Sequence, residues 1–211
     1  MMVRRSLRAA AAGSLAALAL GLLAGCDSST HATASATAGT SAPAASPSPT
    51  PSVKTLPPSE LCTVLTTGVA RTLVPTARLT ARVQPNKGTA PDVCDYSAPD
   101  GTATLSLTPA TRTYAAELSA AHDLSAHPAA AGMSKVLVDP VSGLGTQAFR
   151  ETAYQTQARQ SITFVVWNAG TRNWVLTLAK TSATPTTPPA ATNDPVVKVA
   201  RTLTAKLPTK K

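Results

Sequence analysis

The chain has 211 residues and a formal charge of +9, from 19 lysines and arginines against 10 aspartates and glutamates. Aromatic residues make up only 3% of the chain, too few for the stacking platforms that single-stranded nucleic-acid binders use. The charge is also modest for a protein that must neutralise many phosphates, so we expect no nucleic acid among its partners.

The N-terminus has the parts of an export signal in their usual order. Three arginines lie within the first eight residues, and an apolar run of small residues and leucines extends over residues 9–24. The run ends in Leu23-Ala24-Gly25-Cys26, which resembles the lipobox where a bacterial lipoprotein signal is cut before the cysteine that receives lipid. We therefore predict a signal peptide over residues 1–25, a lipid on Cys26, and a position on the outer face of the cytoplasmic membrane.

The alternative for this stretch is an uncleaved transmembrane helix. Residues 9–25 offer 17 positions, the lower limit for spanning a bilayer, and many of them are Ala or Gly. We favour cleavage, which leaves 16 basic against 10 acidic residues, a balance of +6. That balance permits attraction to anionic lipid heads or to cell-wall polyanions.

Residues 26–58 are predicted to form a lipidated tether. Of the 32 residues after Cys26, 26 are Ser, Thr, Ala or Pro, so almost nothing there can offset the entropy of ordering the chain. Residues 59–208 have the length of a single domain with one hydrophobic core, and residues 209–211 form a short basic tail.

The first predicted element of the domain is a helix that Ser59 caps and Pro75 ends. Residues 78–83 alternate as a half-buried strand would, with Leu79, Ala81 and Val83 on one side. A turn follows over residues 85–88. The apolar face of the helix consists of Leu61, Leu65, Val69 and Leu73.

A short strand is predicted around Cys94 and Tyr96. Asp100-Gly101 then makes a hairpin turn into a clean alternation over residues 103–107, with threonines and a serine facing outward. Thr111 or Thr113 begins a second helix. Its apolar residues are Tyr114, Leu118, Ala121 and Leu124.

The second half repeats this plan loosely. We expect a strand over residues 136–138 and a hairpin of residues 162–166 and 174–178 around a loop at 168–170. A Pro/Thr loop over residues 181–190 precedes a last helix, which Asn193 or Asp194 caps and Pro195 begins. The apolar stripe of that helix consists of Val196, Ala200, Leu203 and Leu207, and it ends near Lys206, Lys210 and Lys211.

These elements predict an α+β fold. Its antiparallel sheet carries helices packed on one face, and the domain consists of two loosely similar halves.

With Cys26 committed to lipid, Cys62 and Cys94 remain. In an exported protein such a pair most simply forms a disulfide. The alternatives are two buried free thiols or, less favoured, a catalytic cysteine.

Three short motifs resemble an actinobacterial lipoprotein family that is catalogued as a domain of unknown function. They are Leu61-Cys62 at a helix start, Cys94-Asp95-Tyr96, and residues 143–148 (Gly-Leu-Gly-Thr-Gln-Ala). The heavy use of Ala, Arg, Thr and Pro fits a high-GC actinobacterial genome. The resemblance implies membrane anchoring, one disulfide and an α+β fold, and it brings no catalytic residues. The family more often has Asp at the position of Thr146, and either residue caps a short helix.

No motif predicts a metal, a cofactor or a nucleophile. His122 and His127 flank Asp123 but do not define a metal site without a third ligand, and exposed histidines at a helix end explain them better. Gly143-Leu144-Gly145 lacks the third glycine of a phosphate loop, so a tight turn is favoured. Neither Gly-x-Ser-x-Gly nor Ser-x-x-Lys occurs in the chain.

Two constellations keep other functions open. Paired carboxylates, as in glycosidases, would require members of one acidic set to meet in space. That set is Asp95, Asp100, Asp139 and Glu151. Trp167 and Trp174 flank the second hairpin loop, where core packing or a cross-strand pair is favoured over a ligand site.

The function that we favour is a non-enzymatic binding or interaction module without a cofactor, lipid-anchored outside the membrane. We expect its partner to be an envelope protein or a cell-wall component. The rivals are a small envelope hydrolase that uses carboxylates and a carrier of a lipid or small apolar ligand.

Overall fold

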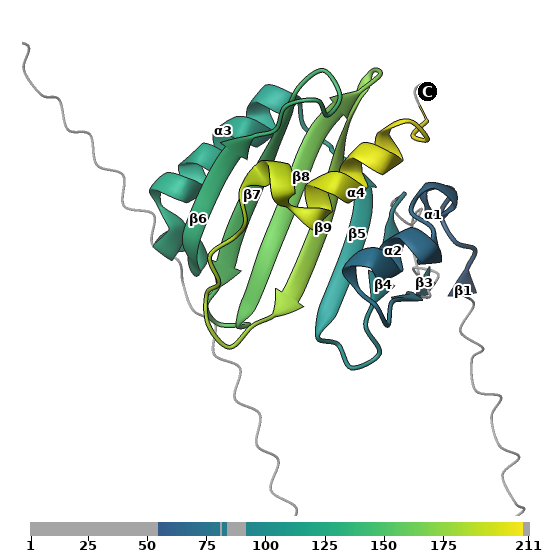
Figure 1. The fold of residues 1–211 in the computed structure, drawn as a ribbon, viewed down its shortest axis with the longest axis horizontal. Coiled ribbons are helices and arrows are strands. Elements are labelled where there is room, and N and C mark those ends of the chain that lie inside the picture. The colour runs from purple at the N-terminus through teal and green to yellow at the C-terminus, as the bar shows by residue number, and fades with distance from the viewer. Residues whose placement is uncertain (1–54, 81, 84–91, 209–211) are drawn as a thin grey trace, which may run out of the picture. The chain divides into compact units, whose positions relative to one another are not determined.

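One antiparallel sheet organises the fold. The computed structural model describes residues 55–80, 82–83 and 92–208, and its main sheet has seven strands in the order β2-β4-β5-β9-β8-β7-β6 (Figure 1). The predicted signal, Cys26, most of the predicted tether, the turn at 85–88 and the basic tail lie outside these residues.

Two antiparallel runs of strands meet at the pairing of β5 with β9. Each half of the sheet therefore consists of neighbouring antiparallel strands. The helices of the domain, however, pack on different faces of the sheet. The strands are β2 (Arg78–Leu79), β4 (Cys94–Ser97), β5 (Ala103–Pro109), β6 (Met133–Pro140), β7 (Ala148–Gln155), β8 (Gln160–Ala169) and β9 (Arg172–Thr181).

The helices cover both faces of the sheet. We call the face under α4 the front and the face under α3 the back (Figure 1). The larger core lies on the front, where side chains such as Leu107 and Leu176 pack with Leu203 of α4. The helices are α1 (Leu61–Val64), α2 (Thr67–Leu73), α3 (Tyr114–Ala126) and α4 (Pro195–Thr204), with single 3₁₀ turns at Pro128–Ala131 and Ala191–Asn193.

The α+β class, the antiparallel sheet and the disulfide are confirmed, with one difference in the placement of helices. Helices α1, α2 and α4 contribute to the front core, whereas Ala121 of α3 packs with Phe149 and Val166 on the back. Successive side chains of a strand point to opposite faces, so Val166 faces back while Trp167 faces front. Because β7 and β8 bury side chains on both sides, both faces require a covering helix.

The first predicted helix is interrupted between α1 and α2. The Thr66 side chain accepts a hydrogen bond from Val69 N, which begins a new helix where a continuous one was expected. Ser59 still serves the first turn, because its Oγ accepts a hydrogen bond from Leu61 N at 3.1 Å. The apolar face survives this break, since Leu61, Leu65 and Leu73 are all buried.

The single strand predicted over residues 78–83 is divided between two sheets. Leu79 pairs with Tyr96 in the main sheet, while β3 (Arg82–Val83) pairs with β1 (Thr55–Leu56) in a separate two-stranded sheet. Leu79 is 40% exposed rather than half-buried toward the core. The last residues of the predicted tether thus include a strand.

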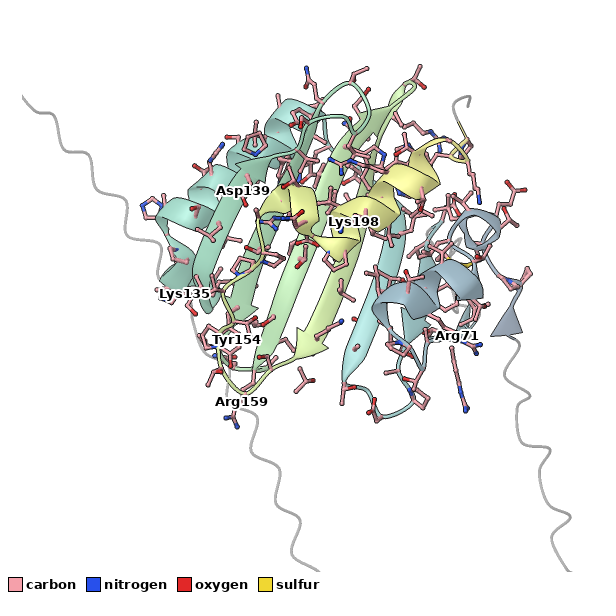
Figure 2. The ribbon with its side chains drawn as sticks, viewed as in Figure 1. Arg71, Lys135, Asp139, Tyr154, Arg159 and Lys198 are labelled. Carbon is pink, nitrogen blue, oxygen red and sulfur yellow. A yellow bond between two sulfur atoms is a disulfide. The ribbon has the colours of Figure 1, made fainter. Side chains whose placement is uncertain are left out.

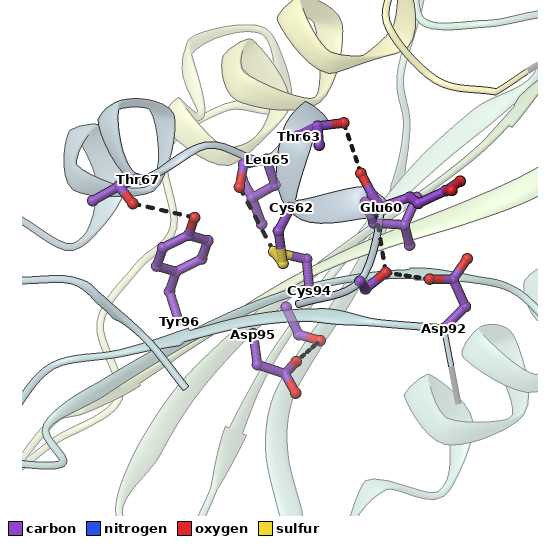
Figure 3. Close-up of a disulfide and its surroundings, with 12 residues drawn as sticks. Glu60, Cys62, Thr63, Leu65, Thr67, Asp92, Cys94, Asp95 and Tyr96 are labelled. Atoms are coloured by element: carbon purple, nitrogen blue, oxygen red, sulfur yellow. Dashed lines mark hydrogen bonds between the residues drawn. A yellow bond between two sulfur atoms is a disulfide. The ribbon is translucent and has the colours of Figure 1, made fainter. Parts of the chain in front are cut away.

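The Cys62–Cys94 disulfide connects α1 to β4 (Figure 3). The two Cα atoms are 5.1 Å apart, and Cys94 is fully buried. A hydroxyl contact of 3.4 Å between Thr67 and Tyr96 makes a second connection between this helical region and β4. The disulfide therefore attaches the first helices to β4, the strand next to the edge strand β2.

The later elements agree with the sequence except at the turn between β8 and β9 and at β7. Thr113 caps α3 through Ala116 N, and Asp194 caps α4 through Val196 N. Strands β8 and β9 pair up to Ala169 and Arg172, so their turn is Gly170-Thr171 rather than residues 168–170. Strand β7 was not predicted at all. Within the described residues, no helix is long and apolar enough to cross a membrane.

Candidate ligand-binding groove

Residues 182–190, which we call the strap, connect β9 to the last helical region across the front of the sheet. The Tyr154 hydroxyl donates to the carbonyl oxygen of Ser182 at 3.1 Å, and Ser182 N donates to Arg159 O at 2.8 Å. At the other end, Arg150 Nη1 donates to Pro189 O at 2.7 Å. Hydrogen bonds from the sheet thus hold the strap near both of its ends.

Two adjoining cavities lie between the strap and the sheet, and together they form the strap groove. The inner cavity has a volume of about 130 Å³ and is lined by strands β6, β7 and β8 and by strap residues 186–189. The outer cavity has a volume of about 180 Å³ and is lined by Lys135, Leu137 and strap residues 185–188. Figure 2 shows Lys135 and Tyr154 beside the strap at this edge of the sheet.

The floor of the inner cavity carries hydroxyl groups. Thr152 pairs with Thr163 across β7 and β8, and Tyr154 pairs with Ser161, so all four belong to the front face. Thr152 is only 6% exposed. Its Oγ1 and the Oγ of Ser161 are buried and have no hydrogen-bond partner in the part of the chain that the structure describes.

Arg150 lies beside the strap groove, where it holds strap residue Pro189. Its side chain is 2% exposed and donates from Nη1 to Asp194 Oδ2 at 2.9 Å and from Nη2 to Asp139 Oδ2. Asp194 is itself buried and also caps α4 through Oδ1. A buried guanidinium needs such compensation, because removing its charge from water is costly. Arg150 Nε nevertheless lacks a partner among the described residues, and a third cavity of about 380 Å³ extends past Arg150 and Asp139.

Strand β6 is distorted where it borders the groove. Its pairing with β7 shifts register between Ser134 and Leu137, and Lys135 has a φ of 53°. Non-glycine residues seldom adopt this left-handed conformation, and β-bulges commonly redirect side chains. Here Lys135 contributes to both cavities. Leu137, beside it, is 47% exposed.

Of the four carboxylates that could have formed a hydrolytic pair, only Asp139 lies near the strap groove, in the lining of the third cavity. Asp95 accepts a hydrogen bond from Ser106. Its strand, β4, is four positions away from β7, the strand of Glu151, in the sheet order. Asp100 accepts from Thr102 N and Oγ1 in its hairpin, and these bonds hold the pKa of its carboxyl below the ordinary value. The sheet therefore does not bring this set of carboxylates together.

Glu151 instead faces back, next to a different carboxylate. Its cross-strand partners are Val138 and Phe164, and it is 8% exposed under α3. Burial, together with the charge of Glu117 on α3, raises the pKa of Glu151 from 4.5 to about 7. The Glu117 carboxylate lies 3.9 Å from the Arg112 guanidinium. This acidic pair was not predicted, because the partner comes from a distant helix.

The histidines lie apart from the groove. His122 is exposed on α3, and His127 is exposed just after its end. The structure contains, in the residues that it describes, no group of three or more His, Cys, Asp or Glu arranged to hold a metal ion.

The Gly143-Leu144-Gly145 segment forms the predicted tight turn. Gly145 has a φ of 59°, and a Cβ added to it would lie 1.8 Å from the carbonyl oxygen of Asn168. The Thr146 hydroxyl donates to Asn168 Oδ1 at 2.8 Å. Thr146 thus attaches the turn to β8. The resemblance had led us to expect that it caps a short helix, and it does not.

Trp167 and Trp174 are direct cross-strand partners and are both fully buried. They belong to the front core, as favoured, and do not line the groove. A separate shallow groove of about 300 Å³ lies between α2 and α4. Its residues include Val69, Leu203 and two lysines of the α4 region, Lys198 and Lys206.

Most residues of the strap groove were missed by sequence reasoning. Arg150, Thr152 and Tyr154 alternate on one face of β7, and Glu151 lies on the other, so neither face looks apolar. The available signal was the alternation of polar residues itself, whereas the left-handed conformation of Lys135 is visible only in the structure. Comparisons with family models, curated proteins and solved structures found no match to this chain, so the family resemblance stays a prediction.

Proposed function

We propose that this protein is a lipid-anchored binding module on the outer face of the cytoplasmic membrane. In this proposal Cys26 carries the lipid, the Ser/Thr/Ala/Pro-rich segment is the tether, and the domain engages an envelope protein or a cell-wall component. A flexible tether raises the local concentration of such a module near neighbouring envelope components. The domain binds its partner without transforming it.

The strap groove is the observation that supports this proposal. Its floor places a buried Thr152 hydroxyl without a described partner next to Ser161, and its rim exposes Leu137 beside Lys135. Buried polar groups in native proteins are nearly always hydrogen-bonded, so such a floor suits a partner that supplies the missing bonds. Binding sites commonly combine apolar walls with a few convergent polar groups.

In-cell photocrosslinking tests the proposed binding surface. A photoreactive residue replaces Leu137 in the lipidated protein, and crosslinked products are identified by mass spectrometry. Leu79 provides a matched control, because it is an exposed leucine on β2, at the opposite edge of the same sheet. We expect a reproducible envelope partner at position 137 and not at 79. Equal yields at both positions, or none at either, would contradict the proposal.

The anchor is tested separately by Cys26→Ala. The wild-type protein should partition into detergent and carry an acyl mass on Cys26, and the variant should lose both properties. Wild-type protein that stays in the aqueous phase without an acyl mass would refute the lipid anchor.

A carrier function is the second candidate, favoured by the groove between α2 and α4. Its apolar residues with Lys198 and Lys206 at one site suit the tail and head of an anionic amphiphile. Its test is a fluorescent fatty acid titrated into the mature protein. A carrier should bind it at one site, and Lys198→Glu with Lys206→Glu should weaken that binding. The hydrolase alternative would instead require cleavage of an envelope polymer that Glu151→Ala abolishes.

A further inference from the structure

The inner cavity of the strap groove contains buried hydrogen-bonding groups that the described chain leaves unpaired. Thr152 lines the cavity and is only 6% exposed, and its Oγ1 is buried without a hydrogen-bond partner among the described residues. Ser161 on the adjacent strand is only half-buried, but its Oγ is likewise buried without a partner among the described residues. These hydroxyls project from neighbouring strands of one rigid sheet, so their spacing is set by the fold rather than by a loop.

The charges that surround the groove balance one another. Lys135 and Arg150 contribute two positive charges, while Asp139 and Asp194 contribute two negative ones. Arg150 is already bound to both carboxylates. A ligand with an isolated charge would lose hydration without meeting a net opposite charge, which disfavours both anions and cations.

Hydroxyl groups dominate the polar lining that remains. Thr152, Ser161 and Thr163 come from the sheet, and Thr186 and Thr187 come from the strap. Each hydroxyl both donates and accepts hydrogen bonds, so its best complement is a group that does the same. A carboxylate only accepts and an ammonium only donates, whereas a ligand hydroxyl does both.

The size and walls of the groove limit the ligand further. An engineered apolar cavity of about 150 Å³ holds one benzene ring, which sets the scale for a six-membered ring. The inner cavity is about 130 Å³, and the outer cavity, about 180 Å³, continues past Leu137 and Pro185. The groove thus has room for one ring, with apolar walls against carbon–hydrogen faces and hydroxyls against its polar edge.

We propose that the strap groove binds a small, uncharged, hydroxyl-rich ligand of the chemical class of a single sugar ring. The ring is either free or at the end of an envelope glycan. This inference rests on the proposed binding function and specifies its ligand. Thr152 and Ser161 hydrogen-bond the ring from below, and Lys135 reaches it from the mouth of the groove.

The test uses the mature lipidated chain in a detergent without a sugar head group. Glucose, N-acetylglucosamine and arabinose are titrated individually and followed by saturation-transfer NMR, with glucuronate and glucosamine as charged analogues. We expect at least one neutral sugar to bind, and its charged analogues to bind about tenfold more weakly or not at all. Binding of a purified envelope polysaccharide, compared with that of the free sugar, then identifies the source of the ring.

Two variants make the test specific. Thr152→Val keeps the shape of the side chain but removes the hydroxyl, and it should weaken binding about three- to tenfold, the loss expected for one neutral hydrogen bond. Thr104→Val changes an exposed threonine on the back face of β5 and should leave affinity unchanged. An unchanged or higher melting temperature of Thr152→Val shows that weaker binding is not a folding defect.

Absence of binding by every sugar, or equal affinity of wild-type protein and Thr152→Val, overturns the inference. Tighter binding of glucuronate than of glucose also overturns it, because the charge argument would then be wrong. If Leu137 crosslinks to an envelope protein while no sugar binds, the binding module stands and this inference alone fails.

Discussion

The buried carboxyl of Glu151 gives the domain a stability that decreases as pH rises. Its pKa is about 7 in the folded protein, against an ordinary value of 4.5, so the folded state binds the proton more tightly than the unfolded state does. The sign follows from this order. Stability from this group is complete below about pH 4.5, declines as pH rises toward 7, and is constant above that range.

The size of the effect follows from the pKa difference. At about 1.4 kcal/mol per pH unit, a change from 4.5 to about 7 corresponds to at most about 3 kcal/mol. Glu151 and its neighbour Glu117 are not completely buried. The remaining contact with solvent reduces the cost of the Glu151 charge below this limit. We therefore expect wild-type protein to lose roughly 1–2 kcal/mol of unfolding free energy between pH 4.5 and pH 8 through this group.

Glu151→Gln isolates this contribution, because glutamine keeps the shape without the charge. The measurement is urea unfolding of the disulfide-intact protein, followed by the fluorescence of the buried Trp167 and Trp174. At pH 8 the variant should be more stable by roughly 1–2 kcal/mol, a shift of about 0.5–1 M urea in midpoint, and the difference should vanish near pH 4.5.

Glu117→Gln is the control for this experiment. It removes the neighbouring charge but leaves Glu151 buried, and it also loses the contact with Arg112, so its gain at pH 8 should be smaller. If Glu151→Gln and the wild-type protein lose the same stability between the two pH values, burial of this carboxyl is not the cause.

The remaining predictions concern the disulfide, the Arg150 ion pairs and the Gly145 turn. Cys94→Ser should cost about 3–4 kcal/mol in urea unfolding, since the disulfide closes a loop with a sequence separation of 32; a smaller loss than 1 kcal/mol would contradict this. Arg150→Met should cost about 3–5 kcal/mol because it leaves a buried Asp194 carboxylate unpaired, whereas Asp194→Asn, which still caps α4, should cost less. Gly145→Ala should cost at least about 2 kcal/mol from its clash with Asn168, while Gly143→Ala, at a φ of 68° with open space around it, should cost about 1 kcal/mol; equal effects would refute the steric argument.

The parts of the fold that could be predicted are those where local chemistry and packing agree. Thr113 and Asp194 are good N-cap residues ahead of apolar stripes, and both helices begin where expected. The alternation of Ala103, Leu105 and Leu107 has one face to bury, and the structure buries it. In such segments, propensity, periodicity and capping all indicate the same structure.

Failures arose where tertiary pairing decided the outcome. Residues 78–83 alternate correctly for one strand, yet β2 and β3 join different sheets, and no local pattern encodes which partner each finds. Helix α3 was expected on the same face as the others. It covers the back, because β8 buries apolar side chains in both directions, Trp167 at the front and Val166 at the back, and only the assembled sheet shows the second face.

The failure at β7 explains why the candidate site was missed along with the strand. A strand is recognised from sequence by one consistently apolar face, but the front of β7 carries Arg150, Thr152 and Tyr154, and its back carries Glu151. Placing such residues in the middle of a sheet costs stability unless each finds a partner. Arg150 and Tyr154 find theirs in Asp194 and in the strap, whereas the Thr152 hydroxyl finds none in the described chain. Residues that break local sequence rules are expected at functional sites, and β7, which breaks them most strongly, is also a strand that borders the groove for which we propose a binding function.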